Sequence, residues 1–283
     1  MNFQWKCAAS LVAAIMMTLL ATTAFAAEGA VDWNKGVVRA VGIGVGKAAY
    51  KNNPGLYRAQ AKRAAMMDAQ RNLAEIVKGV QVSSESTMRD LELESDIVRT
   101  RIDAIIKGMS EVSSQYLSDG TYEVVLEMPL FGAKDSLSEA AFIPFKDEPK
   151  VSFPQPVNTT IINQPTVINN NYTGLIIDCR GLSAGALNPV MSPVIKNDNV
   201  QAIYGHKNLD YDKIILNGMA SYADDISDQI SRSRAGNNPL VVKAVNLSDI
   251  NANPVVSTAD ADKILAANQH DRFLENCAVV FVK

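Results

Sequence analysis

The sequence predicts an α+β N-terminal domain, with a mainly antiparallel sheet and two helices on one face, followed by an α/β C-terminal domain with smaller helices. Strand-like and helix-like patterns alternate in the first half of the chain and close in a hairpin. Continuous apolar runs, separated by short helical patterns, occupy the second half. A proline- and asparagine-rich segment between the two halves indicates a linker.

The first 26 residues have the features of a cleavable export signal. Lys6 supplies a positive charge, residues 8–20 are largely apolar, and Ala24-Phe25-Ala26 provides small residues for the peptidase. Cleavage is predicted between Ala26 and Ala27. An uncleaved membrane anchor is the alternative, but a spanning helix needs about 20 continuous apolar residues. Because Cys7 precedes the apolar stretch instead of following it, we do not expect it to carry a lipid.

The N-terminal domain, predicted over residues 27–144, begins with a strand and a long helix. Apolar residues at every second position from Val37 to Val45 indicate a half-buried strand. A helix is predicted from about Pro54 to Gly79, because one set of apolar residues recurs at spacings of three and four. These residues are Met66, Ala69, Leu73, Ile76 and Val80.

A weak strand, a second helix and a hairpin complete this domain. Residues 82–88 alternate weakly as a strand, and Ser95 offers a cap for a helix that ends at Gly108. The strand-like runs 112–117 and 122–130 flank an Asp119-Gly120 pair, which is a strong hairpin signal. The order of these elements predicts the antiparallel sheet and its two helices.

Part of this domain resembles a known family. The glycine-spaced strand Val41-Gly42-Ile43-Gly44-Val45, the alanine-rich helix from Ala64 to Glu75 and the closing hairpin resemble the twenty-kilodalton membrane-lipoprotein family. The same module is similar to the N-terminal domain of the flagellar assembly protein T. The resemblance covers about Val37 to Leu130. It implies an envelope protein of bacteria with two membranes, in some cases part of an assembly around the flagellum, and it supplies no catalytic residues.

The linker is predicted over residues 145–172 and the α/β domain over residues 173–283. Apolar runs at residues 174–179, 240–245 and 278–282 are typical of strands buried on both faces. One helix is predicted from Met219 to a stop at Gly236, because apolar residues from Met219 to Ile230 recur at helical spacing. Asp224, Asp225 and Asp228 are expected on its opposite, solvated face. Ser257 and Asp260 form a capping pattern that opens a second helix. This domain carries no family resemblance that we identify.

Charge and cysteine content limit the classes of partner. The chain has 27 Lys and Arg against 30 Asp and Glu, a net charge of −3, and loss of Lys6 with the signal makes it slightly more acidic. A nucleic-acid partner, which favours a basic surface, is therefore not expected. Cys179 and Cys277 would remain in a compartment where disulfides persist, so a bridge between them is allowed but not required. Buried cysteines also serve as small apolar residues.

Asp178 is the least ordinary candidate for a functional residue. It closes an apolar strand, and α/β sheets present functional groups at the carboxyl ends of their strands. The sequence places no phosphate-binding or metal-binding residues beside it. An ordinary strand-end carboxylate with Arg180 as its near partner is the favoured interpretation.

Three other patterns are weaker. Residues 44–49 fit the G-x-G-x-x-A form of a dinucleotide loop, but no helix follows directly, which favours glycines that pack within a sheet. His206 could bind a cation with Asp210 and Asp212, although a solvated loop is favoured. A catalytic pair of Cys179 and His206 is disfavoured because Cys277 is available as a disulfide partner. No catalytic, metal-binding or cofactor-binding set is predicted, and no cofactor.

Two hypotheses about function follow. The first is an exported, non-enzymatic cell-envelope protein that contributes to a periplasmic or outer-membrane-associated assembly. Its N-terminal module would bind envelope proteins or a second copy of the chain, and membrane contact would be peripheral or through a partner. The alternative is an enzyme or small-ligand-binding protein with its site near Asp178 in the C-terminal domain.

Overall fold

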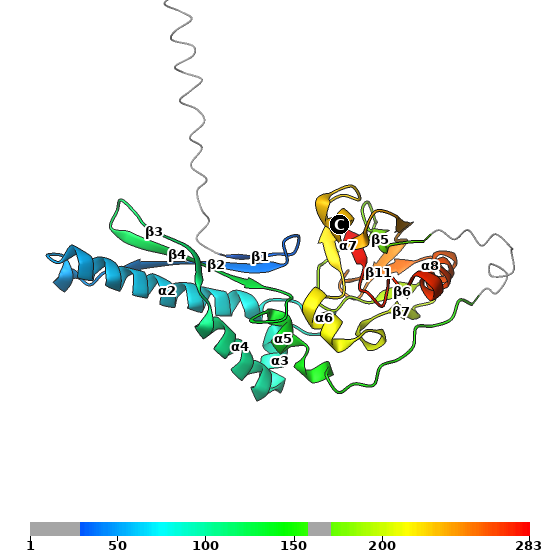
Figure 1. The fold of residues 1–283 in the computed structure, drawn as a ribbon, viewed down its shortest axis with the longest axis horizontal. Coiled ribbons are helices and arrows are strands. Elements are labelled where there is room, and N and C mark those ends of the chain that lie inside the picture. The colour runs from blue at the N-terminus through cyan, green and yellow to red at the C-terminus, as the bar shows by residue number, and fades with distance from the viewer. Residues whose placement is uncertain (1–28, 158–170) are drawn as a thin grey trace, which may run out of the picture.

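The computed structural model describes residues 29–157 and 171–283, which form two units (Figure 1). We call residues 29–145 the N-terminal unit and residues 171–283 the C-terminal unit. The predicted signal peptide and residues 158–170 of the predicted linker lie outside the described residues. Within the described ranges, no helix combines the length and the apolar character that a membrane crossing requires.

A four-stranded antiparallel sheet forms an elongated arm in the N-terminal unit (Figure 1). Its strands, in spatial order, are β1 (Ala30–Asp32), β2 (Val37–Val45), β4 (Thr121–Pro129) and β3 (Glu111–Tyr116). β2 pairs with β4 along its whole length. The predicted hairpin is confirmed, and Gly120 adopts the positive φ of 89° that its turn requires.

The long helix α2 (Pro54–Lys78) lies along one face of this sheet and ends at Gly79, as predicted. Asn53 caps it by accepting a hydrogen bond from Leu56 N. Gly42 and Gly44 face the helix, and a Cβ atom on Gly42 would lie 2.1 Å from the backbone nitrogen of Ala69. Because these glycines have no side chain, the helix backbone can approach the strand closely. This agrees with the interpretation of Gly44 as a sheet-packing glycine and not as part of a dinucleotide loop.

Two shorter helices follow, and the first of them replaces a predicted strand. The prediction of a strand over residues 82–88 is wrong, because only the isolated bridge between Gln81 and Thr87 forms. A capping box between Thr87 and Asp90 instead starts α3 (Met88–Glu94). The next helix, α4 (Asp96–Gly108), begins after Ser95 and ends at Gly108 as predicted.

The C-terminal unit contains a parallel sheet with all four strands in one direction. The order is β8 (Ser221–Ala223), β12 (Val279–Val282), β5 (Gly174–Asp178) and β9 (Pro239–Lys243). β5 and β12 are almost wholly buried, as their apolar sequences predicted. The helix α7 (Gln229–Ala235) packs on one face, where Ile226 and Ile230 contact a small buried cluster.

A second, mixed sheet lies in the same unit. Its strands are β10 (Asn246–Ser248), β11 (Asn253–Val256), β6 (Ile195–Asn197) and β7 (Ala202–Tyr204). The helices α6 (Tyr211–Asn217) and α8 (Thr258–Asp271) complete the unit. The hydroxyl of Ser257 accepts a hydrogen bond from Asp260 N, so the predicted cap of α8 is confirmed. The overall class is α+β, with a parallel layer in the C-terminal unit.

The helix predicted from Met219 to Gly236 is confirmed only at its end, where α7 stops before Gly236, and its first part is wrong. Residues 221–223 form the edge strand β8 instead, paired with residues 280–282 of β12. Asp228 then caps α7 by accepting a hydrogen bond from Ser231 N. Strand pairing with a distant segment has overridden the helical spacing of the apolar residues.

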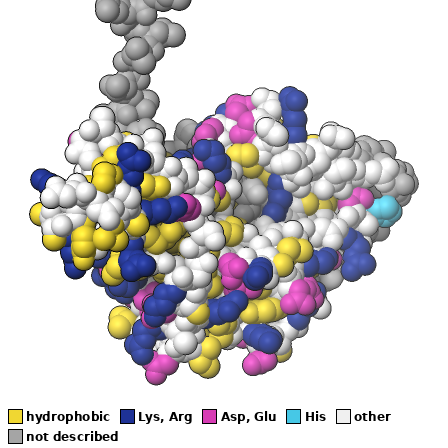
Figure 2. Space-filling view, turned by 60° about the vertical axis from the view of Figure 1, so that its left-hand side comes forward, with side chains coloured by type: hydrophobic (Ala, Val, Ile, Leu, Met, Phe, Trp, Pro, Cys, Tyr) yellow, Lys and Arg dark blue, Asp and Glu magenta, His cyan; other side chains and the backbone are white. Residues whose placement is uncertain are grey.

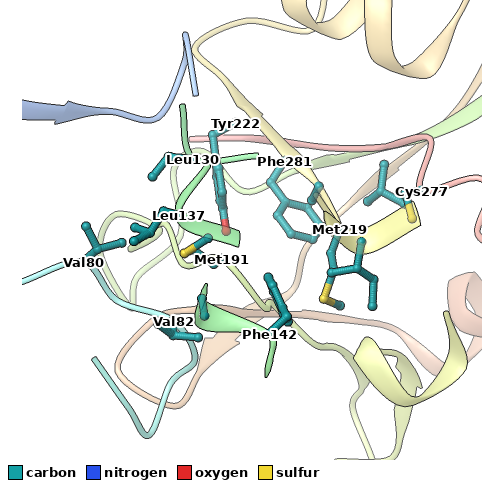
Figure 3. Packing of buried hydrophobic residues seen from close by; sticks show 14 of the residues in the cluster. Val80, Val82, Leu130, Leu137, Phe142, Met191, Met219, Tyr222, Cys277 and Phe281 are labelled. Carbon is teal, nitrogen blue, oxygen red and sulfur yellow. The ribbon is translucent and has the colours of Figure 1, made fainter. Parts of the chain in front are cut away.

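The two units share one buried hydrophobic cluster (Figure 3). Val82, Leu137 and Phe142 of the N-terminal unit belong to it together with Met191, Met219 and Phe281 of the C-terminal unit. Phe142 follows α5 (Leu137–Ala141) and has no exposed surface. Large apolar contact of this kind favours a fixed arrangement of the two units over free domain motion.

Hydrogen bonds and ring contacts reinforce this junction. Ser192 N donates to Val82 O at 2.7 Å, and the Ser138 hydroxyl donates to Ile215 O at 2.8 Å. The ring of Trp33 packs edge-on against Tyr222, with 5.6 Å between the ring centroids. Backbone groups from both units are therefore satisfied only while the units stay together.

Residues 146–157 run along the C-terminal unit after the 3-10 turn η2 (Ile143–Phe145). Val151 N donates to Lys207 O at 2.7 Å, and Val157 N donates to an Asp262 carboxylate oxygen at 2.7 Å. Phe153 stacks on Tyr204, with 6.4 Å between ring centroids. This part of the predicted linker is thus held against the C-terminal unit by hydrogen bonds and aromatic packing.

Ile250 lies in a strained turn between β10 and β11. It has φ 54°, its neighbours Asp249 and Asn251 have φ 50° and 61°, and its side chain is 56% exposed. A β-branched residue is strained in the left-handed region, whereas asparagine tolerates it. We therefore expect Ile250→Asn to raise the free energy of unfolding by about 0.5–1 kcal/mol. Urea denaturation measures this change. The control Ile250→Val should leave the free energy of unfolding unchanged, because valine is also β-branched. Equal effects of the two substitutions would contradict strain at this position.

Candidate functional site

The carboxyl edge of the parallel sheet gathers charged side chains from several strands. Asp178 ends β5, Lys243 ends β9, Lys283 follows β12 and Asp224 follows β8. All four strands run in the same direction, so these ends meet at one edge of the sheet. This is the edge where α/β sheets usually present functional groups.

Arg180 forms ion pairs with two carboxylates at this edge. Its Nε lies 2.9 Å from Asp178 Oδ1, its Nη2 lies 3.1 Å from Asp178 Oδ2, and its Nη1 lies 2.9 Å from Asp225 Oδ2. The side-chain hydrogen bonds from Arg180 hold the pKa of Asp178 below its usual value. Hydrogen bonds from Ser227, and then those from Arg180, lower the pKa of Asp225 to about 2.

A second ion pair ties this edge to the N-terminal unit. Lys283 Nζ lies 2.9 Å from Asp224 Oδ1, and the amide of Asn34 donates to Asp224 Oδ2 at 2.7 Å. Asn34 belongs to the turn between β1 and β2, so one carboxylate joins both units. The hydrogen bonds from Lys283 and Asn34 lower the pKa of Asp224.

This arrangement fits a structural clamp better than a reactive site. A general base needs a free carboxylate with a pKa near the working pH, whereas Asp178, Asp224 and Asp225 have lowered pKa values and bind cations. Among residues 29–157 and 171–283, no group of three or more His, Cys, Asp or Glu could hold a metal ion. The edge can therefore fix the strand ends and the neighbouring turn in place.

Arg180→Met should weaken this clamp in a pH-dependent way. The Arg180 side chain is 39% exposed, so solvent screens its ion pairs and we expect only a small loss of stability at neutral pH. Because folding lowers the pKa of Asp225 from 3.8 to about 2, its contribution is complete above pH 3.8 and is lost as the pH falls towards 2. The effect of Arg180→Met should shrink over the same range.

Urea denaturation between pH 6 and pH 2.5 measures this effect. Arg232→Met is the matched control, since Arg232 is exposed and forms no ion pair among the described residues. A loss of stability that does not depend on pH, or that is equal in the two variants, would contradict the interpretation of this edge as a structural clamp.

The suggested bridge between Cys179 and Cys277 does not form, and both residues are buried free thiols. Cys179 follows the carboxyl end of β5, whereas Cys277 precedes the amino end of the parallel neighbour β12. The register places them about six strand positions apart, or about 20 Å, while a disulfide needs Cα atoms within about 7 Å. Burial raises the pKa of the Cys179 thiol to about 12, so it is not a reactive nucleophile.

His206 contacts Glu148 and Phe145, whereas Asp210, which lines the same pocket, serves as a helix cap. The Nε2 atom of His206 is 3.2 Å from Glu148 Oε2, and its ring is 4.9 Å from that of Phe145. Asp210 instead caps α6 by accepting hydrogen bonds from Asp212 N and Lys213 N. The pocket beside His206 has a volume of about 140 Å³, which is smaller than typical ligand sites of about 300–1,000 Å³.

The sequence identified Asp178 and its partner Arg180, and the structure brings them together as expected. It did not identify Asp224, Asp225 or Lys283 as members of the same edge. The predicted helix from Met219 to Gly236 had placed both aspartates on a solvated helix face. The sequence did contain a signal for Lys283. This residue directly follows an apolar run, 278–282, which was predicted to be a strand, so it could have been placed at a strand end as Asp178 was.

Two family models match separate parts of the chain. The family model of the LPP20 lipoproteins matches residues 39–128. A model of the second domain of Treponema pallidum Tp0624 matches residues 174–283. No curated protein matches the chain. The resemblance inferred for the N-terminal unit is therefore confirmed, and the C-terminal unit is similar to a domain that the sequence analysis did not identify.

Proposed function

Starting from an N-terminal unit of the LPP20 lipoprotein family, we propose that this chain is an exported, non-enzymatic component of a periplasmic or outer-membrane-associated assembly. The family match indicates an envelope-associated protein. The finer proposal is that the chain presents the arm of its N-terminal unit to envelope proteins or to a second copy of itself. Assemblies around the flagellum are included among the candidates.

The observation that carries the proposal is the junction between the two units. Their shared buried cluster and the Ser192–Val82 and Ser138–Ile215 hydrogen bonds make the C-terminal unit a fixed base for the projecting arm. A rigid base with a projecting arm suits a structural component that must hold a partner at a set position. The ion-paired carboxylates at the sheet edge support the same view.

Cross-linking in cells followed by affinity capture of the tagged chain tests this proposal. We expect the chain to be recovered from the envelope fraction in cross-linked species larger than one copy. Captured material from the periplasmic and membrane fractions should be compared with that from a strain expressing the tag on an unrelated exported protein. A strictly monomeric chain that leaves the cell with the culture medium would overturn the proposal.

The competing enzyme or receptor hypothesis depends on Asp178, which Arg180 already engages through two hydrogen bonds. Thermal-shift measurements with divalent metals, nucleotides and envelope sugars distinguish the two functions. The proposal predicts that none of these ligands stabilises the chain. A ligand that stabilises the wild type but not Asp178→Ala, while still stabilising Arg180→Met, would favour the competing function.

A further inference from the structure

The free end of the arm is basic. It comprises residues 45–63, which include the end of β2, the 3-10 turn η1 (Ala48–Tyr50) and the first turns of α2, and we call it the arm tip. The sequence contains no Asp or Glu between Asp32 and Asp68. Over the same stretch the arm tip contributes five cations, although the whole chain has a net charge of −3. The five are Lys47, Lys51, Arg58, Lys62 and Arg63.

Most of these cations are not neutralised by the protein. Lys62 forms an ion pair with Glu111, whereas Lys47, Lys51 and Arg63 are without an ion-pair partner in the part of the chain that the structure describes. The guanidinium of Arg58 lies 4.8 Å from the centre of the Tyr116 ring. In the neighbouring hairpin, the Asp119 carboxylate accepts hydrogen bonds from Thr121 N and Oγ1 at 2.9 and 2.7 Å.

Apolar side chains lie among the cations of the arm tip. Val45 is 57% exposed, Leu56 is 40% exposed and Tyr50 is half-buried. Figure 2, in which the arm comes forward, shows hydrophobic and Lys or Arg side chains intermingled over this part of the molecule. The tip is the end of the arm that points away from the C-terminal unit (Figure 1). A projecting end of this composition is suited to contact with a flat surface.

We propose that the arm tip docks on a membrane surface that exposes anionic phospholipid headgroups, a contact that rests on the proposed envelope function. Lys47 and Lys51 contact headgroup phosphates, and each such cation strengthens binding to an anionic surface. Val45 and Leu56 enter the boundary between headgroups and acyl chains. Exposed apolar residues interleaved with cations, on an end that projects away from the rest of the molecule, are the composition that binds at an anionic membrane interface.

Co-sedimentation with vesicles tests the docking directly. The purified, processed chain is mixed with vesicles of phosphatidylethanolamine and phosphatidylglycerol, or of phosphatidylcholine alone. We expect binding to the anionic vesicles only, and a decrease in the bound fraction as salt shortens the range of the attraction. The double variant Lys47→Glu/Lys51→Glu should weaken binding by at least about tenfold. Both lysines are exposed, so the variant should keep the thermal stability of the wild type.

Lys207→Glu/Lys263→Glu is the matched control, since it makes the same change in net charge on exposed lysines of the C-terminal unit. It should bind anionic vesicles as the wild type does. An equal loss in both double variants, or no binding of the wild type to anionic vesicles, would overturn the docking. If the tip variant instead loses a cross-linked envelope protein while vesicle binding is absent, the occupant is an acidic protein. None of these vesicle results decides the envelope proposal, which the cellular capture experiment tests separately.

Discussion

Gly42→Val is expected to destabilise the N-terminal unit by at least about 3 kcal/mol. A Cβ atom at this position would lie 2.1 Å from Ala69 N and 2.3 Å from Ala65 O, both backbone atoms of α2. No side-chain rotation relieves a clash with backbone, so the helix must move away from the sheet. Urea denaturation followed by far-UV circular dichroism measures the loss.

The matched control is Gly55→Ala, at a nearby glycine where an added side chain meets no close backbone atom. Gly55 lies in the first turn of α2, where the nearest atom to an added Cβ is Asn53 Oδ1 at 3.8 Å. Alanine is a better helix former than glycine, so this change should stabilise the protein by up to about 1 kcal/mol. Similar stability of the Gly42→Val variant and the wild type would contradict the close packing of β2 on α2.

Phe142→Ala should destabilise the chain by about 3–5 kcal/mol and separate the unfolding of the two units. The ring is fully buried in the cluster that both units share, and its removal leaves a cavity at their junction. We expect one cooperative urea transition for the wild type. The variant should show two transitions, because the arm and the C-terminal unit no longer stabilise each other.

Phe142→Leu serves as the control, since it keeps most of the apolar volume and should cost less than about 1.5 kcal/mol. Comparing circular dichroism with tryptophan fluorescence separates the units, because Trp33 lies at the junction. A single transition with unchanged midpoint in Phe142→Ala would contradict a stabilising role of Phe142 at the junction.

The sequence predicted the elements whose signals are local. The strand Val37–Val45 and the helix α2 were predicted from their own periodicity, and Gly79 marked the end of the helix. The start of α4 after Ser95 followed from a capping side chain. Such signals depend only on residues a few positions apart, so these elements could be predicted without knowledge of the tertiary contacts.

The errors arose where distant segments decide the structure. Residues 221–223 pair with a strand almost 60 positions later, and this pairing replaces the first part of the expected helix. The helix α3 was missed although the Thr87–Asp90 capping box is visible in the sequence. The weak alternation of residues 82–88 predicted a strand at a place where this cap starts a helix.

The candidate site was only partly predictable for the same reason. Asp178 was recognisable because it ends an apolar strand, and its near partner Arg180 lies two residues away. The contributions of Asp225 and Asn34 depend on how strands and units pack, which no local pattern encodes. The separation of Cys179 from Cys277 likewise depends on the parallel register of β5 and β12.

The intact mass of the chain recovered from the cell-envelope fraction tests the central claim most directly. Export predicts a mass that begins at Ala27, with the first 26 residues removed and no lipid added to the polypeptide. An unprocessed chain that begins at Met1 and is recovered from the cytosol would contradict the assignment of this protein to the envelope.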